Sequence, residues 1–174
     1  KTKAEYPTVK VAESPKSLIN RNNVDLVYIA CPPEFHREYA LIAISESIPV
    51  YLEKPLGIDI EESKDLVKLL EKSTTPNIVN FGQASSEALQ ITKEALSSNR
   101  TGPIKGVDII MQYQQWPRSW QVTADWLRFR KAGGYVREVL SHFIFVTERL
   151  LGPSKIIFSK PLYPSQQDLC ETHI

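Results

Sequence analysis

The stretch Val24-Asp25-Leu26-Val27-Tyr28-Ile29-Ala30-Cys31-Pro32-Pro33-Glu34-Phe35-His36 decides the fold class of this chain. Residues 24–30 are almost all apolar and are rich in β-branched and aromatic side chains. This pattern is typical of a strand that is covered on both faces of a parallel sheet. Cys31-Pro32-Pro33 ends the predicted strand, and a helical pattern begins near Glu34 with Phe35, Tyr39, Ile42 and Ala43 on its predicted buried face. The stretch therefore predicts the first half of a βαβ unit.

The same alternation extends to both sides of this stretch. Ser14 followed by Pro15 predicts a short helix up to about Ile19. Further strands are predicted at residues 49–52 and 77–81. Helices are predicted at residues 59–72, with Val67 and Leu70 inward, and at residues 85–98. Strands alternating with helices at this spacing predict right-handed crossovers and a doubly wound parallel sheet over residues 1–100.

The second part of the chain has a different pattern, which begins after Thr101-Gly102-Pro103. Residues 104–115 and 155–163 predict strands, and Gly133-Gly134 precedes a helical pattern that ends at Leu151. Long strands around one helix predict the start of an α+β domain with a mixed or antiparallel sheet over residues 101–174.

Composition excludes several classes of partner. The 174 residues carry a net charge of +1, without long runs of like charge and without an apolar stretch long enough to span a bilayer. We therefore expect neither nucleic acid nor membrane as a partner. Cys31 and Cys170 lie far apart, so we expect no metal site and no disulfide framework. A reducing compartment, the cytoplasm, is compatible with this cysteine content.

Three segments follow predicted strands, at the edge where open α/β sheets bind ligands. They are Cys31-Pro32-Pro33 with His36, Glu53-Lys54-Pro55, and Gly82-Gln83. Pro55 restricts the backbone of Lys54, so the lysine is held on a rigid element, where partial desolvation would suit it to acid–base catalysis. Taken alone, the tripeptide favours the alternative, an exposed lysine beside a glutamate, because most such pairs are surface features.

Two further candidates lie in the second part of the chain. Glu138 and His142 are four residues apart on a predicted helix, so their side chains can meet, and a carboxylate makes a paired imidazole a better base. The spacing alone favours the alternative, which is a surface ion pair or a half-buried histidine with satisfied hydrogen bonds. Trp116, Trp120 and Trp126 are candidates to line a sugar-sized pocket, although aromatic residues more often serve packing alone. The glycine pair either permits a close backbone approach or only begins a helix.

The order of these motifs resembles the glucose–fructose oxidoreductase/inositol dehydrogenase family (Gfo/Idh/MocA). The resemblance rests on residues 24–36, Glu53-Lys54-Pro55, Gly133-Gly134, His142 and Leu150-Leu151-Gly152. It covers residues 14–152.

This resemblance implies an NAD(P)-dependent oxidoreductase that moves a hydride between the nicotinamide ring and a carbinol carbon of a sugar or polyol. Residues 1–100 would be the C-terminal part of a Rossmann domain, and residues 101–174 the start of a substrate and dimerisation domain. The implied catalytic residues are Lys54, His142 and Glu138, and the implied substrate contacts are Trp126 and His142. The implied cofactor-binding residues are Ala30, Cys31, Pro32, Pro33, His36, Glu53, Lys54 and Gln83. The cofactor would be NAD or NADP, and the full-length protein a homo-oligomer.

The sequence also departs from this family. The chain lacks the Gly-x-Gly-x-x-Gly turn that seats a pyrophosphate, so we expect a fragment truncated at both ends and inactive by itself. Tyr135 and Leu140 replace frequent glycines, and Glu138 and Phe145 stand where aspartate is common. Two alternatives stay open: a dinucleotide-binding sensor without turnover, and an inactive truncation product.

Overall fold

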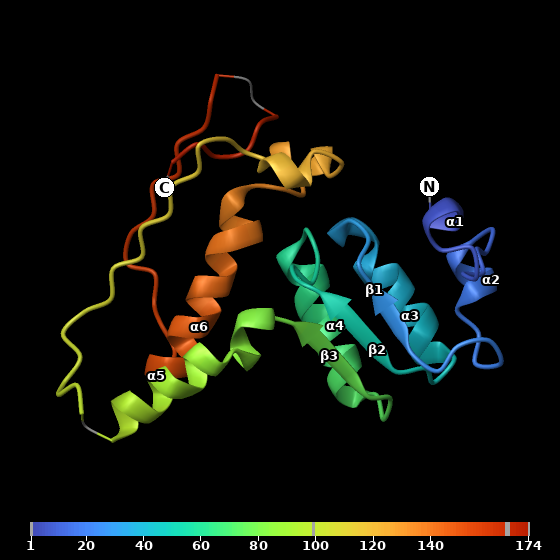
Figure 1. Ribbon diagram of the computed structural model, residues 1–174, viewed down its shortest axis with the longest axis horizontal. Helices are drawn as coiled ribbons and strands as arrows, with labels where there is room; N and C mark the ends of the chain where they lie inside the picture. Colours follow the sequence, from blue (N-terminus) through green and yellow to red (C-terminus); the bar gives the residue numbers. More distant parts are fainter. Residues whose placement is uncertain (1, 99, 166–167, 174) are drawn as a thin grey trace. The chain divides into compact units, whose positions relative to one another are not determined.

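The computed structural model describes residues 2–98, 100–165 and 168–173. Contacts divide the chain into two compact units, Lys1–Asn80 and Phe81–Ile174 (Figure 1). The predicted functional domains, with their boundary near residue 100, stay a prediction. None of the described helices is long and apolar enough to cross a membrane.

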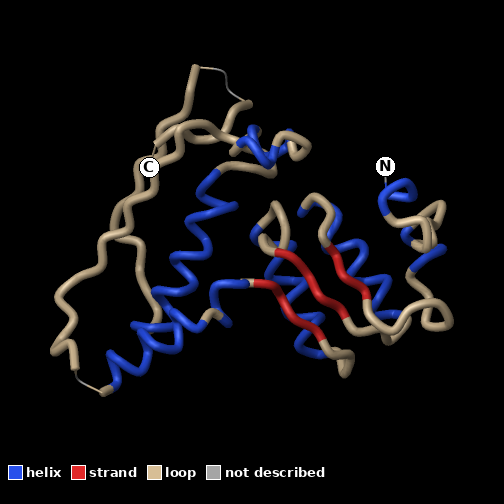
Figure 2. Tube along the Cα trace, viewed as in Figure 1, coloured by secondary structure: helices blue, strands red, loops and turns tan. Residues whose placement is uncertain are grey.

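The first unit is a small α/β layer structure. Its three strands form one parallel sheet in the order β1-β2-β3, as the alternation of the sequence predicts (Figure 2). Along the chain, its elements are α1 (Thr2–Glu5), α2 (Pro15–Leu18), β1 (Val27–Ile29), the 3₁₀ helix η1 (Pro33–Phe35), α3 (His36–Ser45), β2 (Val50–Glu53), α4 (Ile60–Lys72) and β3 (Asn77–Asn80).

Two helices of this unit, α2 and α4, begin with side-chain N-caps. The hydroxyl of Ser14 accepts a hydrogen bond from the Ser17 backbone N–H, and the Asp59 carboxylate accepts one from Glu62 at 2.8 Å. Each cap satisfies a backbone donor that the first turn of a helix leaves unpaired. These bonds are local, so the start of each helix follows from a few neighbouring residues.

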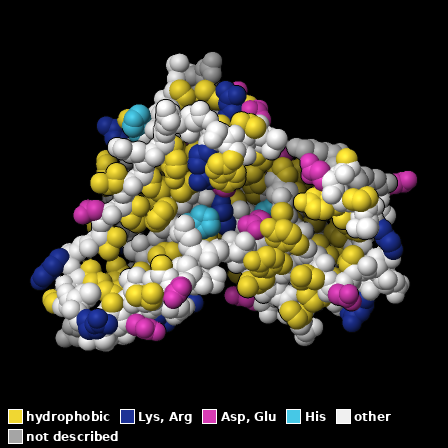
Figure 3. Space-filling model, viewed as in Figure 1, with side chains coloured by type: hydrophobic (Ala, Val, Ile, Leu, Met, Phe, Trp, Pro, Cys, Tyr) yellow, Lys and Arg dark blue, Asp and Glu magenta, His cyan; other side chains and the backbone are white. Residues whose placement is uncertain are grey.

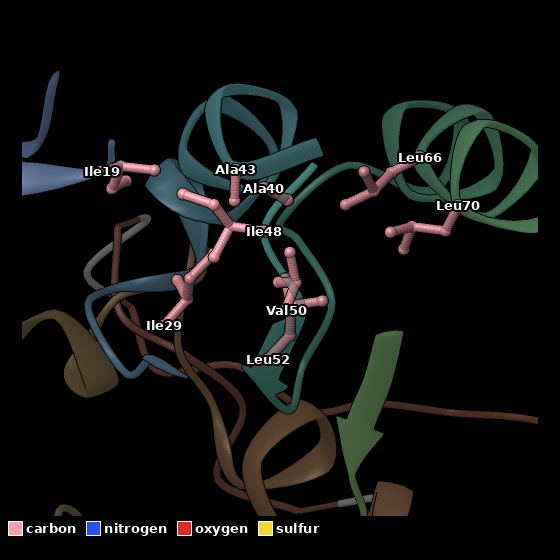
Figure 4. Close-up of a cluster of buried hydrophobic side chains, with 9 residues drawn as sticks. All are labelled: Ile19, Ile29, Ala40, Ala43, Ile48, Val50, Leu52, Leu66 and Leu70. Atoms are coloured by element: carbon pink, nitrogen blue, oxygen red, sulfur yellow. The ribbon is translucent and has the colours of Figure 1, made fainter. Parts of the chain in front are cut away.

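Both α3 and α4 cover the same face of the sheet. On that face, Ile29 of β1 pairs with Leu52 of β2, which in turn pairs with Val79 of β3. Two successive right-handed crossovers in one direction place both helices on one side. Figure 4 shows the resulting core. Its buried members are Ile19, Ile29, Ala40, Ala43, Ile48, Val50, Leu52, Leu66 and Leu70.

The opposite face of the sheet is open, which corrects the prediction that β1 is covered on both sides. Tyr28, Tyr51 and Ile78 form the register ladder on that face. Tyr28 is 55% exposed and Ile78 is 57% exposed. Burial of that face needs an element from outside the β1–β3 crossovers, because both crossover helices lie on the other side.

The buried faces of the helices differ by one residue from the predicted ones. In α3 the structure buries His36 and Ala40 together with the predicted Ala43, whereas Phe35 is exposed. The predicted Tyr39 and Ile42 are only partly buried. Alanine at the contact allows the helix backbone to approach the sheet closely, and this close packing determines which face turns inward.

Helix α4 shows the same kind of shift. Leu66 is fully buried next to Leu70, while the predicted Val67 is 39% exposed. Leu66 and Leu70 are four residues apart and therefore lie on one helical face, and each leucine fills more of the core than valine would.

The second unit is built from helices and long irregular segments. Its elements are the 3₁₀ helix η2 (Gly82–Ser85), α5 (Glu87–Ser97), the 3₁₀ helices η3 (Ser119–Gln121) and η4 (Asp125–Arg128), the π-helix η5 (Val136–Leu140) and α6 (Ser141–Leu151). Ser86 is the N-cap of α5, and α6 ends at Leu151, directly before Gly152, whose φ is 93°. A positive φ suits glycine, so the end of α6 is a local effect.

The strands predicted at residues 104–115 and 155–163 do not form in the described part of the chain. Antiparallel pairing there is limited to two isolated bridges, Phe129 with Leu169 and Leu162 with His173. An extended segment becomes a strand only when a neighbour accepts and donates its backbone hydrogen bonds. Apolar side chains of these segments are largely exposed, Ile157 by 95%, and hydrophobic atoms are widely visible on the surface in Figure 3.

Candidate functional site

The C-terminal ends of β1, β2 and β3 meet at one edge of the sheet in the first unit. The segment Ala30–Pro33 follows β1, Glu53 is the last residue of β2, and Lys54 comes directly after it. The structure therefore brings most of the predicted cofactor-binding residues to the edge where parallel α/β sheets bind ligands. Lys54 is half-buried at this edge.

His36 is a buried residue between two of these loops. Its Nε2 lies 2.8 Å from the carbonyl oxygen of Cys31, and the side chain is 1% exposed. Burial lowers the pKa of His36, and the backbone carbonyls of Cys31 and Pro55 act in the opposite direction. A neutral imidazole that donates from Nε2 to Cys31 fits this environment. The position of His36 favours a role in shaping the loops after β1 and β2.

Glu53 is held by side chains from both neighbouring strands. Its Oε1 accepts a hydrogen bond from the hydroxyl of Tyr28 and another from Nδ2 of Asn80, the latter at 2.8 Å. The hydrogen bond to Glu53, followed by burial and the Glu53 charge, raises the pKa of Tyr28 to about 12. The rings of Tyr28 and Tyr51 pack with centroids 5.3 Å apart.

Tyr28 and Asn80 are members of this site that the sequence motifs did not predict. They are remote from Glu53 along the chain and meet it only through strand register, in which Glu53 pairs with Asn80 and Tyr51 pairs with Tyr28. Tyr51 and Glu53 are two residues apart, so both point to the open face of the sheet. The signal that could have predicted the contact is the presence of polar residues, Glu53 and Asn80, at the ends of two neighbouring predicted strands.

In the second unit, His142 lies in an aromatic environment at the start of α6. The Phe81 ring meets the imidazole edge-on, with centroids 5.9 Å apart, and stacks on Phe145 at 4.3 Å. Phe145, which stands where an aspartate is common in the resembled family, therefore serves as a packing partner. Glu138 lies in the π-helix η5, whose wider turn alters the four-residue spacing on which the predicted pair with His142 was based. That pairing stays a prediction.

The glycine pair permits close backbone contacts before η5. A Cβ on Gly133 would lie 2.4 Å from the carbonyl oxygen of Leu127, and one on Gly134 would lie 2.6 Å from Oε1 of Glu171. Gly134 also has a φ of 97°. The space next to it is occupied by the buried Glu171 carboxylate, which accepts a hydrogen bond from the Val136 backbone N–H at 2.8 Å. An anion at this position satisfies the first turn of η5.

The second unit also contains a cavity of about 1030 Å³. Residues 109–116 and 169–173 contribute much of its lining, and η5 contributes Leu140 rather than Glu138. Of the three tryptophans, Trp116 lines the cavity and donates from Nε1 to the Leu127 carbonyl at 2.9 Å. Among the described residues, neither Trp126 nor His142 lines it, so this cavity does not unite the predicted substrate residues.

The other predicted residues occupy separate elements of the second unit. Trp126 belongs to η4, and Trp120 is 70% exposed beneath the Arg118 guanidinium, 4.6 Å from the ring centroid. Gln83 lies in η2, and its carbonyl accepts a hydrogen bond from the Ser86 hydroxyl at 2.8 Å. The cofactor and substrate roles of Gln83 and Trp126 stay predictions.

Comparison with known proteins identifies the class. Residues 1–81 match the sequence model of an oxidoreductase family with an NAD-binding Rossmann fold, GFO_IDH_MocA. The chain is 30% identical over 132 residues to Oxidoreductase P35 from Formosa agariphila, covering 74% of this chain and 41% of that protein. It is 27% identical over 158 residues to 1-carboxy-3-chloro-3,4-dihydroxycyclo hexa-1,5-diene dehydrogenase from Comamonas testosteroni, covering 89% and 38% of the two chains.

A solved structure shows the same fold. The WlbA dehydrogenase from Bordetella pertussis, crystallised with NADH and UDP-GlcNAcA, superimposes with a TM-score of 0.72 at 22% identity, over 87% of this chain and 44% of that one. These similarities show an NAD-binding Rossmann fold of the kind found in this oxidoreductase family. Over residues 1–81 the chain matches the Gfo/Idh/MocA oxidoreductase family, and it spans about 40% of the length of the two relatives named above.

Proposed function

We propose that the full-length protein is an NAD(P)-dependent oxidoreductase that transfers a hydride between the nicotinamide ring and a carbinol carbon of a sugar or polyol. The observation that carries this proposal is the position of Lys54. It follows β2 directly and stands next to Glu53, whose carboxylate is fixed by Tyr28 and Asn80. A titratable group on such a rigid element, at the ligand-binding edge of an α/β sheet, suits acid–base catalysis.

The edge formed by the three strand ends fits a nicotinamide nucleotide. Glu53 Oε2 accepts no hydrogen bond from any residue that the structure describes, so it is available to a hydroxyl or amide donor of a ligand. A carboxylate attracts such donors and repels phosphate, which favours the ribose and nicotinamide end of the cofactor over its pyrophosphate. The residues that would hold this end are Ala30, Cys31, Pro32, Pro33, His36, Glu53, Lys54 and Gln83.

The cofactor would supply the hydride acceptor or donor, and the side chains of this chain would handle the proton. In the oxidative direction, Lys54 would accept the substrate hydroxyl proton at Nζ, and in the reductive direction it would return it. His142 and Glu138 would complete the acid–base set, with the Phe81 and Phe145 rings restricting water around the imidazole. Trp126 would contact the substrate. A homo-oligomer of the full-length protein belongs to the same proposal.

Kinetics of the full-length protein test the role of Lys54. We expect Lys54→Met to lower kcat by roughly 10²–10⁴-fold with the best substrate of a sugar and polyol panel. The matched control is Lys64→Met, because Lys64 is an exposed lysine paired with Glu61 at 2.8 Å. The NADH dissociation constant should change little in Lys64→Met. Unchanged turnover in Lys54→Met would exclude the assigned role.

A second function is favoured by the aromatic packing around His142. Phe145 stacks on Phe81 beside the imidazole, so the position at which the resembled family often has aspartate supplies an apolar ring next to the predicted catalytic histidine. A sensor that binds the dinucleotide without turnover would show micromolar or tighter NADH binding and no hydride transfer across the whole panel.

A further inference from the structure

Three side chains from three neighbouring strands converge on the open face of the sheet. Tyr28 comes from β1, Glu53 from β2 and Asn80 from β3, and both hydrogen bonds end on the same oxygen, Glu53 Oε1. No local motif links these residues, which are separated by 25 and 27 positions along the chain. The sheet itself assembles the cluster.

Strand register explains why these residues meet. Glu53 and Asn80 are direct partners across β2 and β3. Tyr28 is the partner of Tyr51, two residues before Glu53, so its long side chain can reach the carboxylate along the diagonal. The Tyr51 ring, 5.3 Å away between centroids, supports the Tyr28 ring. The orientation of Glu53 is thus determined from both sides.

The two bonds have a chemical consequence for the carboxylate. Both donors are uncharged, and hydrogen bonds to an ionised acceptor are stronger than those between neutral groups. Because two hydrogen bonds hold Oε1, the carboxylate cannot rotate freely, and Oε2 therefore points in one fixed direction. Oε2 accepts nothing from the described residues, so a fixed acceptor is presented at the end of β2.

We propose that Tyr28 and Asn80 are positioning residues that hold Glu53 so that its Oε2 accepts hydrogen bonds from the hydroxyl groups of the nicotinamide ribose. This inference rests on the proposed function. It gives the open face of the sheet a role in aligning the cofactor. Neither Tyr28 nor Asn80 belongs to a sequence motif that predicts such a role. The two residues act through Glu53 and do not touch the reacting atoms.

Cofactor binding by the full-length protein tests this inference. We expect Tyr28→Phe and Asn80→Leu each to weaken NADH binding by about 5- to 10-fold, while kcat at saturating cofactor changes by less than about 3-fold. The matched control is Tyr51→Phe, because Tyr51 is the register partner of Tyr28 and packs its tilted ring against it, but donates no hydrogen bond from its hydroxyl to any described residue. Its NADH affinity should stay within about 2-fold of the wild type.

An analogue of NADH that lacks a hydroxyl on the nicotinamide ribose separates positioning from general sheet packing. The wild type should lose affinity for the analogue relative to NADH, while Tyr28→Phe and Glu53→Gln should discriminate much less, because the hydroxyl has lost its fixed acceptor. The inference would be overturned if the affinity losses caused by the analogue and by Tyr28→Phe were purely additive. It would also be overturned if Tyr51→Phe lost as much NADH affinity as Tyr28→Phe. Thermal midpoints accompany every variant, and if Tyr28→Phe does not fold, Asn80→Leu removes the other donor from the opposite strand.

The outcomes also distinguish this inference from the proposed function. If Lys54→Met abolishes turnover while Tyr28→Phe and Asn80→Leu bind NADH normally, the positioning role is wrong and the proposed function stands. If the wild type does not bind NADH at all, the proposed function fails first.

Discussion

The imidazole Nε2 of His36 lies 2.8 Å from the carbonyl oxygen of Cys31, so the first residue of α3 is tied to the loop that follows β1. The histidine is 1% exposed. A residue that the sequence singles out as a ligand contact therefore also holds together the backbone at the strand end. This double position makes His36 a sensitive test of how the edge of the sheet is maintained.

We expect His36→Ala to lower the free energy of unfolding by roughly 2–4 kcal/mol, because it leaves a cavity and a buried carbonyl without its donor. Urea denaturation measures the change. His173→Ala is the matched control, since His173 is exposed and its Nδ1 meets only the neighbouring Thr172 hydroxyl. A loss for His36→Ala no greater than that for His173→Ala would contradict the structural role.

The stability of the protein should also depend on pH through His36. Burial lowers the pKa of His36 in the folded state, so the unfolded state binds the proton more readily. The contribution is fully present above the unfolded pKa of about 6.5 and is lost as pH falls through the lower folded pKa. His36→Gln keeps an amide donor without titrating. Between pH 7 and pH 5, the wild type should therefore lose more unfolding free energy than His36→Gln does. A difference between the two proteins that stays constant over this range would exclude the linkage.

A graded series of glycine substitutions tests the approach of Glu171 to the backbone. Gly134→Ala should destabilise by at least about 2 kcal/mol, because it combines a positive φ with a Cβ 2.6 Å from the Glu171 carboxylate. Gly152→Ala should lower the stability less. The φ of Gly152 is also positive, but nothing lies within 4 Å of the added Cβ. Gly106→Ala, which has neither constraint, should be nearly neutral. Equal thermal shifts for the three variants would be inconsistent with this arrangement.

The buried carboxylate of Glu171 should itself stabilise the start of η5. Glu171→Ala removes the acceptor of the Val136 N–H bond, and we expect a loss of roughly 1–3 kcal/mol. Glu171→Gln retains an acceptor oxygen of similar size and should lose less. Denaturant unfolding of both variants makes the comparison, and an equal effect would show that the hydrogen bond is not the stabilising feature.

The Tyr28 hydroxyl should deprotonate only at unusually high pH. Its pKa of about 12 has the hydrogen bond to Glu53 as the largest cause, so Glu53→Gln should bring the pKa down towards 10. Because the folded pKa is the higher one, the stabilisation is complete below pH 10 and is lost as pH rises through 12. Titration of the ¹³C-labelled tyrosine ring by NMR measures this, with Tyr28→Phe assigning the resonance. A pKa that Glu53→Gln does not lower would mean that the hydrogen bond is not its cause.

Short-range features of this protein follow from its sequence. The caps at Ser14, Asp59 and Ser86 bond to backbone groups three residues away, and the alternation of strands and helices is visible in the apolar pattern. The location of Lys54 at a strand end follows from the same pattern. Each of these features depends on interactions within a few residues, which a linear sequence displays directly.

Long-range relationships were decided by tertiary structure alone. The Tyr28–Glu53–Asn80 cluster depends on strand register, and the contact between Glu171 and Val136 joins residues 35 positions apart. The one-residue rotation of the buried face of α3 depends on how closely alanines let the helix approach the sheet. Residues 104–115 have the apolar alternation of a strand but lack a paired neighbour in the described chain. Local propensity determines which segments are able to form elements, whereas register, burial and backbone pairing depend on what packs next to them.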